Sequence, residues 1–193
     1  MSKLETNTID TISGSTNLTL GGTNATDITI PSGVTITNNG TQSGFGGINT
    51  PAFHVVLSAG QSISDNTETI VALNSETFDT DNAYDTSTYK FTPQVAGKYF
   101  VYSNIYLESG ANTNMNRCFT NIYKNTTQMF FNFFDPRDNP GRSFTCNASG
   151  IIELNGSTDY VLVKGLIVGQ ATGSGLEIAG GNGTYFGAYK IIE

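Results

Sequence analysis

Residues 78–102 read FDTDNAYDTSTYKFTPQVAGKYFVY, and this stretch decides how the chain folds. Three of its aromatic residues, Phe91, Tyr99 and Phe100, are placed to fill the gap between two β-sheets, where each would bury roughly 150–250 Å². Gly97 stands where a strand begins, so we expect a positive φ or a close backbone approach there. The stretch therefore predicts a sandwich of two sheets with an aromatic core.

Strand-like segments recur on both sides of this stretch. Residues 52–57 form a short apolar run after Pro51, which is typical of a buried strand. Turn signals such as the Asp-Pro-Arg-Asp-Asn-Pro-Gly loop at 135–141 separate the later segments, and no window has the periodicity of an amphipathic helix. We predict an all-β, antiparallel sandwich. The strand candidates are residues 52–57, 69–74, 89–92, 97–107, 117–124, 127–134, 143–154, 159–168 and 184–192.

The composition excludes several classes of protein. The 193 residues carry a net charge of -7, and only 13% of them are charged, against about 25% in a usual domain. Thr, Asn and Ser make up about a third of the chain, which favours strands and turns over long helices or coiled coils. With no basic patch and no long apolar run, we expect no nucleic-acid partner, no membrane span and no secretory signal.

Little in the sequence indicates catalysis. A Ser-His-Asp or Cys-His arrangement would have to use His54, the single histidine, which lies between apolar residues of the run at 52–57. A structural or interface role suits that position better than catalysis. No glycine-rich segment matches a phosphate loop, and no Trp is available to line a sugar-binding groove. We predict a protein that is not an enzyme and has no cofactor.

Two acidic clusters and two cysteines leave narrower questions open. Asp79, Asp81 and Asp85 form one cluster and the loop at 135–139 forms another; either could hold Ca²⁺, but neither has the spacing of a recognised calcium loop, so we interpret both as solvated turns. The two cysteines, Cys118 and Cys146, are too few for a disulfide framework and could pair only if they lie on neighbouring strands.

The first 44 residues differ from the rest of the chain. They contain no aromatic residue, whereas all 21 aromatics lie at Phe45 or beyond. Aliphatic residues alternate with Thr, the period-two pattern of a strand with one apolar face, and Gly-Gly, Pro-Ser-Gly and Asn-Asn-Gly supply turns. We predict an extended β-rich arm at 1–44, a linker at 45–51 and a head at 52–193. The aliphatic residues of the arm are Ile9, Ile12, Leu18, Leu20, Ile28, Ile30, Val34 and Ile36.

The arm cannot close a core of its own, because it has so few apolar side chains. Composition alone would favour a disordered tail. The regular aliphatic edge instead favours an arm that docks on a partner, either the same segment of sister chains or the surface of another protein. We therefore interpret residues 1–44 as an assembly and anchoring arm.

The head resembles a known family. Pro-Ala-Phe at 51–53, the Tyr-Asp pair at 84–85, Lys-Phe-Thr at 90–92 and Pro-x-x-x-Gly-x-Tyr-Phe at 93–100 are similar to the globular head shared by complement component 1q and the tumour-necrosis-factor superfamily. Asp-x-Val-x-Val at 159–163 and Tyr-Phe-Gly at 185–187 agree more weakly. The residues that carry the core and the family motif are Phe53, Phe78, Tyr84, Phe91, Gly97, Tyr99, Phe100, Tyr185, Phe186 and Gly187.

The resemblance implies a jelly roll of about ten strands that assembles as a compact homotrimer. In this setting Tyr84 and Asp85 belong to a turn-rich connection, and Gly187 lets a strand pass a bulky neighbour. Three arms leaving such a trimer could pair or wrap together, which would remove their exposed edges.

These features together suggest a bacteriophage virion protein. Our first hypothesis is a trimeric capsid decoration or cement protein on the particle surface, with residues 1–44 bound to the major capsid protein or another virion component and the head outward. The alternative is a receptor- or glycan-binding tip of a tail fibre, in which the loops at 111–115 and 135–142 contact a host surface glycan or receptor.

Overall fold

The computed structural model describes residues 32–33, 49–110, 115–170 and 175–192. The chain divides into two units, residues 1–45 and 46–193. The eight aliphatic arm residues lie outside the described residues, as does the linker up to residue 48. Ser32 and Gly33 form a turn with a φ of 85° at Gly33, in the Pro-Ser-Gly segment where a turn was predicted. No helix that could span a membrane occurs among the described residues.

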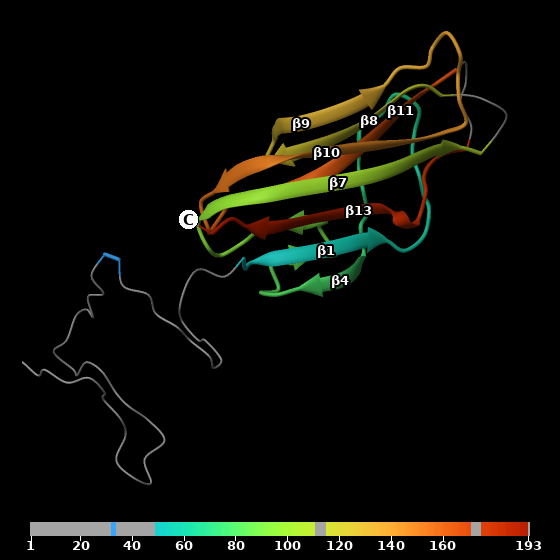
Figure 1. Cartoon of the computed structure of the whole chain (residues 1–193). Coiled ribbons are helices and arrows are strands. Elements are labelled where there is room, and N and C mark those ends of the chain that lie inside the picture. The colour runs from blue at the N-terminus through green and yellow to red at the C-terminus, as the bar shows by residue number, and fades with distance from the viewer. Residues whose placement is uncertain (1–31, 34–48, 111–114, 171–174, 193) are drawn as a thin grey trace, which may run out of the picture. The chain divides into compact units, whose positions relative to one another are not determined.

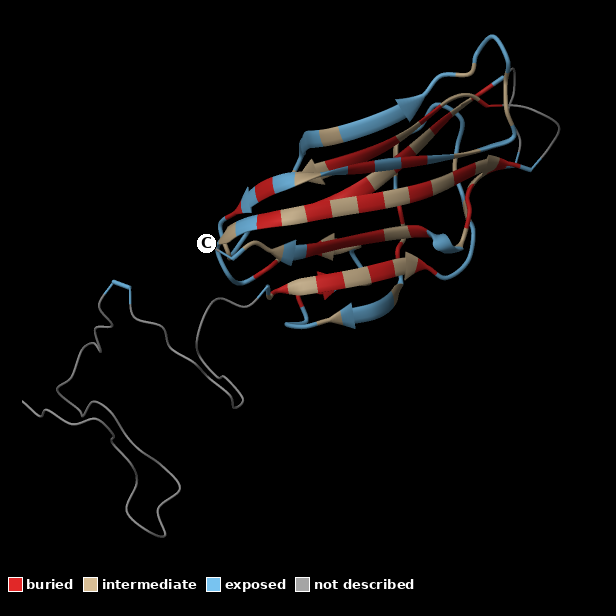
Figure 2. Ribbon diagram, in the orientation of Figure 1, coloured by how far each residue is buried: buried red, intermediate tan, exposed pale blue. Residues whose placement is uncertain are grey.

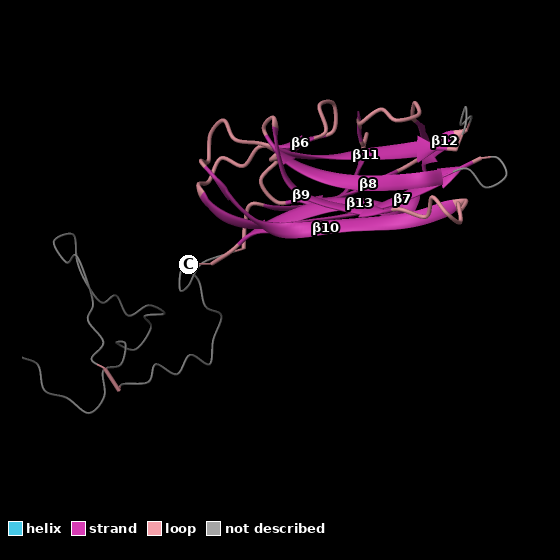
Figure 3. Ribbon diagram, turned by 90° about the horizontal axis from the view of Figure 1, so that it is seen from above, coloured by secondary structure: helices cyan, strands magenta, loops and turns pink. Residues whose placement is uncertain are grey.

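The head is built from two antiparallel sheets (Figures 1 and 3). The first sheet has the order β2–β12–β7–β13–β1–β4. β12 and β13 pair with successive parts of one edge of β7, and β10 pairs with its opposite edge. Figure 1 shows β10, β7, β13, β1 and β4 side by side. The strands of this sheet are β1 (Ala52–Leu57), β2 (Gln61–Ser62), β4 (Ser75–Asp79), β7 (Gly97–Ser109), β10 (Ser143–Leu154), β12 (Leu176–Ile178) and β13 (Gly181–Lys190).

The second sheet covers the inner face of the first. Its order is β5–β6–β11–β8–β9, and β3 pairs with β11. β9 is therefore an edge strand of this sheet, as β10 is of the other. The strands are β3 (Thr69–Ile70), β5 (Tyr84–Asp85), β6 (Lys90–Phe91), β8 (Met115–Lys124), β9 (Thr127–Phe134) and β11 (Val161–Gly169).

Buried residues alternate with less buried ones along the long strands of both sheets (Figure 2), and the side chains of the buried residues form the core. Phe53 lies at its centre: its ring is 4.4 Å from that of Phe91, 4.9 Å from that of Tyr84 and 5.1 Å from that of Phe186, measured between centroids. The Tyr84 hydroxyl donates a hydrogen bond to the Leu73 carbonyl, so its polar end is satisfied inside the core. The aromatic core expected from residues 78–102 is present.

Three aromatic residues of the motif lie outside this core, which corrects our expectation for them. The prediction that Phe100 fills the gap between the sheets is wrong, because consecutive residues of a strand point to opposite faces and Tyr99 takes the inward position. Tyr185 is likewise only partly buried, next to the buried Phe186, and Phe78 on β4 is 47% exposed.

The predicted strand boundaries agree best with the structure where the strands are long. The predicted strands at 127–134 and 143–154 coincide with β9 and β10. β2, β4, β5 and β12 were not predicted as strands. Tyr84 and Asp85, expected in a turn-rich connection, form β5, which pairs with β6.

Gly97 begins β7 with a φ of 144°, as expected of a position that favours glycine.

Candidate assembly surfaces

An aromatic cluster covers the outer face of the sheet formed by β4, β1, β13 and β7. Alternation along each strand turns these side chains away from the core, and strand pairing places them together: Phe100 is opposite Tyr189, and His54 is opposite Phe78. We call this surface the aromatic face. Its members are His54, Phe78, Phe100, Tyr102, Tyr185 and Tyr189.

The rings of the aromatic face contact one another across the strands. The His54 ring lies 5.4 Å from that of Tyr185, and the Tyr102 hydroxyl lies 3.1 Å from His54 Nδ1, within hydrogen-bond distance. Gly187 makes this arrangement possible, because a Cβ there would lie 2.4 Å from the Tyr102 hydroxyl oxygen. This is the passage of a strand beside a bulky side chain that the sequence predicted for Gly187.

Neither titratable group at the centre of this face is charged at neutral pH. Burial lowers the pKa of His54 below its ordinary value of 6.5, and burial raises the pKa of Tyr102. His54 is thus a neutral member of an aromatic surface, and this surface presents ring faces and edges with little charge.

A second apolar surface lies on β9. Seven of the eight residues of this edge strand are exposed, and the exception is Phe130. Phe131 and Phe133 are 58% and 49% exposed, their rings lie 6.2 Å apart, and the Phe133 ring stacks on that of Phe119 from β8. We call this surface the phenylalanine flank. Its members are Met129, Phe131, Phe133 and Phe134.

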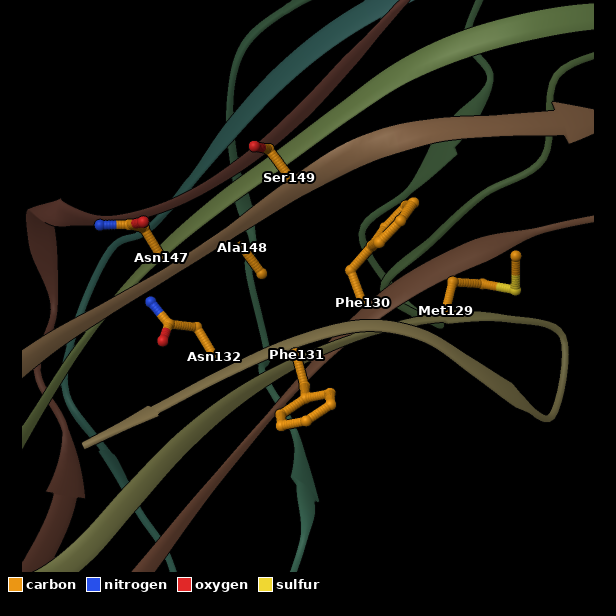
Figure 4. Close-up of a pocket in the computed structure, with 7 residues that line it drawn as sticks. All are labelled: Met129, Phe130, Phe131, Asn132, Asn147, Ala148 and Ser149. Atoms are coloured by element: carbon orange, nitrogen blue, oxygen red, sulfur yellow. The ribbon is translucent and has the colours of Figure 1, made fainter. Parts of the chain in front are cut away.

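An open groove of about 400 Å³ lies beside the flank, where β9 and β10 face each other (Figure 4). Phe130 and Phe131 point to opposite sides of β9 in this view. Gly150 on β10 leaves room for the Phe130 ring, since a Cβ there would lie 2.1 Å from it. The groove is thus apolar where Met129, Phe130 and Phe131 line it and polar where the side-chain amides and the serine hydroxyl line it. The lining residues are Met129, Phe130, Phe131, Asn132, Asn147, Ala148 and Ser149.

In the first acidic cluster Asp79 and Asp85 lie at the ends of β4 and β5 and Asp81 lies in the bend between them, whereas the second cluster lies in the loop after β9. Asp85 accepts hydrogen bonds from Ser87 and Thr88, and these bonds lower its pKa to about 2. Asp135 forms an ion pair with Arg137 in its own loop. Within the residues that the structure describes, no three His, Cys, Asp or Glu side chains gather as a metal site would require.

The phenylalanine flank was not predicted from the sequence. A signal for it is present: the run Met-Phe-Phe-Asn-Phe-Phe at 129–134 places large apolar residues on both faces of one strand. A strand with only one buried face should alternate, so a run without alternation indicates a strand with a second apolar contact. Of the motif residues, Phe53, Tyr84, Phe91, Tyr99 and Phe186 lie in the core, Gly97 and Gly187 shape the backbone, and Phe78, Phe100 and Tyr185 lie on the aromatic face.

Comparisons with known proteins identify the fold. No family model and no curated protein matches the sequence. The globular domain of zebrafish Complement 1qA protein is similar in structure, with a TM-score of 0.51 and 17% identity over 74% of this chain and 98% of that chain. Murine APRIL at pH 8.0 has a TM-score of 0.49 and 17% identity over 72% of this chain and 98% of that chain. The likeness to the complement domain confirms the antiparallel, complement-1q-like jelly roll.

Proposed function

We propose that this chain is a non-enzymatic structural protein whose jelly-roll heads assemble into a homotrimer. The observation that carries the proposal is that one head bears two separate apolar surfaces, the aromatic face on a broad side of the sandwich and the phenylalanine flank at an edge. Large apolar patches of this kind on the outside of a domain mark interaction surfaces.

Two different patches on one chain favour a ring. If the flank of one head packs against the aromatic face of the next, the contact is heterologous, and a heterologous contact that closes on itself forms a cyclic oligomer. The closed ring would also cover the edges of β9 and β10, where unpaired backbone groups otherwise invite uncontrolled pairing. The resemblance of the sequence to the complement-1q and tumour-necrosis-factor heads supports three as the number of subunits.

We further propose that the trimer decorates a bacteriophage particle. The support is the composition of the chain and the arm at 1–44, whose aliphatic and Thr alternation suits strand pairing with a capsid protein or a sister arm. In this proposal the arm anchors the protein and the heads form the particle surface.

The molar mass of the intact chain in solution tests the trimer. Light scattering at micromolar concentration should give three times the mass of the 20.6 kDa chain. A monomer under these conditions would contradict the proposal.

Removal of residues 2–44 tests the particle role separately. The truncated chain should remain a trimer but lose binding to particles that the intact chain decorates. Full occupancy by the truncated chain would refute the anchoring role. Binding of the isolated trimer to host cells, with competition against infection, would favour the tail-fibre tip instead.

A further inference from the structure

Two cysteine side chains meet inside the sandwich. Cys118 lies on β8 and Cys146 on β10, so they belong to opposite sheets, and both are free thiols. Their Sγ atoms are 3.5 Å apart, and the two residues are 0% and 2% exposed. We propose that this pair is a modification site, where a peroxide-class oxidant forms a disulfide that links the two sheets covalently. The bond forms within a single head, whereas the trimer proposed above would cover the edges of β9 and β10 and so slow the reaction.

The geometry requires only a small movement. A disulfide bond is about 2.05 Å long, so each sulfur atom has to approach the other by about 0.7 Å from the present 3.5 Å. Both strands are held firmly: β10 pairs with β7 along its whole length, and β8 lies between β11 and β9. Side-chain rotation can supply the movement. Because the chain has only two cysteines, neither thiol has another partner within the chain.

Two phenylalanine rings lie beside the thiols. Phe134 is the backbone partner of Cys118, and Phe144 is two residues from Cys146 and on the same side of its strand. The centroids of the two rings are 4.5 Å apart. They lie at the edge where β9 and β10 meet solvent, so a small oxidant can pass between them when they move, whereas a bulky one such as oxidised glutathione cannot.

The chemistry balances with hydrogen peroxide as the oxidant. One thiolate attacks a peroxide oxygen, which breaks the O–O bond and gives a sulfenic acid and, with a proton, one water. The second thiol then attacks the sulfenic sulfur, the S–S bond forms, and a second water leaves. Two thiols and one peroxide thus give one disulfide and two waters, and the two electrons lost by sulfur are gained by the peroxide oxygens.

The hydrogen bond between the thiols couples the ionisation of one to that of the other. That bond and burial raise the pKa of Cys118. Either cysteine can attack the peroxide once it has lost its proton, and the other then resolves the sulfenic acid, because either sulfur can be the donor in the hydrogen bond that joins them. Replacing Cys118 with Ala should leave Cys146 as a sulfenic acid that a dimedone probe can capture.

The test uses the reduced, full-length chain at a protein concentration low enough for light scattering to give the mass of a single chain. After incubation with hydrogen peroxide, the protein is unfolded, treated with N-ethylmaleimide and analysed by mass spectrometry. We expect the loss of two hydrogen atoms, no maleimide adduct and a cross-linked peptide pair containing Cys118 and Cys146. The bond closes a loop of 28 positions, so the melting temperature should rise by about 10 °C. Oxidised glutathione should produce neither change in the folded chain.

Single variants provide the control. The variants Cys118→Ala and Cys146→Ala keep the exposed Met129, so they control for oxidation of methionine by the same oxidant. Neither variant can form the disulfide within one chain, so their melting temperatures should not rise. The mass measurement on the natural sequence does not depend on how these variants fold. Two maleimide adducts after peroxide treatment, or a disulfide formed only between two chains, would overturn the proposal.

Discussion

The phenylalanine flank gives the sharpest prediction about assembly. We expect the double variant Phe131→Ser, Phe133→Ser to be a monomer at concentrations where the natural chain is a trimer. The two side chains are 58% and 49% exposed in the single head, and a phenylalanine exposes roughly 200 Å² when free. Together they offer about 210 Å² to a neighbour, or about 5 kcal/mol for each contact at 25 cal/mol per Å².

That loss should be visible as a change in subunit affinity. The entropy cost of association is the same for the natural chain and the double variant, so it cancels in the comparison. A loss of about 5 kcal/mol therefore raises the dissociation constant of each subunit contact by roughly three orders of magnitude or more. Sedimentation equilibrium over a range of protein concentrations measures this directly. The isolated head should also lose up to about 4–5 kcal/mol of stability on the same scale, because about half of each ring is already buried in it, so the comparison is made under conditions where circular dichroism shows the variant to be folded.

A matched substitution away from both surfaces provides the control. Val95 is 43% exposed in the turn before β7, so Val95→Ser removes a smaller exposed apolar group away from both surfaces and should leave the trimer intact. If the double variant on β9 assembles as tightly as the natural chain, the flank is not a subunit contact and our reasoning is wrong.

Three further predictions concern the core and the aromatic face. Phe91→Ala should lower the free energy of unfolding by about 3–5 kcal/mol in urea titration, because Phe91 is fully buried against Phe53; a loss below 1 kcal/mol would contradict that packing. Gly187→Ala should lower the free energy of unfolding by about 1–3 kcal/mol, because its Cβ would lie 2.4 Å from the Tyr102 hydroxyl oxygen. Gly183→Ala should lower it by less than about 1 kcal/mol, because the nearest atom to its Cβ would be 3.7 Å away. Equal losses in the two variants would refute this explanation. Burial lowers the pKa of His54 in the folded chain below its ordinary value of 6.5, so the unfolded chain binds the proton more tightly. The contribution of neutral His54 to stability is therefore complete above pH 6.5 and is lost as the pH falls from 6.5 through the lower pKa of the folded chain. The melting temperature should decrease less from pH 7.5 to pH 5 for His54→Gln than for the natural chain, and identical decreases would exclude the effect.

The sequence predicted the long strands and the aromatic core because local patterns determine them. Phe91 and Gly97 stand in a motif whose turn and strand signals are complete within a few residues. The short strands β2 and β12 pair with each other, and nothing in Gln61–Ser62 or Leu176–Ile178 marks them as strands without that partner. Their existence depends on contacts between segments far apart in the chain.

The surfaces were harder to predict than the core for the same reason. Phe100 and Tyr99 are adjacent aromatic residues, and only the pairing of β7 with its neighbours decides which of them points inward. The thiol pair shows this limit too, since the approach of Cys118 to Cys146 depends on how the two sheets stack.

The position of β7 has a consequence for synthesis of the chain. All three of its partners, β10, β12 and β13, lie after it in the sequence, and the last residue of β13 follows the last residue of β7 by 81 positions, from Ser109 to Lys190. At the usual rate of 5–20 residues per second, both edges of an emerging β7 stay open for roughly 2–9 s, until β10 ends 45 positions after Ser109, and the edge that pairs with β13 stays open for roughly 4–16 s. During that interval Lys-Tyr-Phe-Val-Tyr, at residues 98–102, is an unpaired strand that can aggregate. Slower initiation or a lower growth temperature, which leaves fewer unfinished chains near one another, should raise the soluble yield.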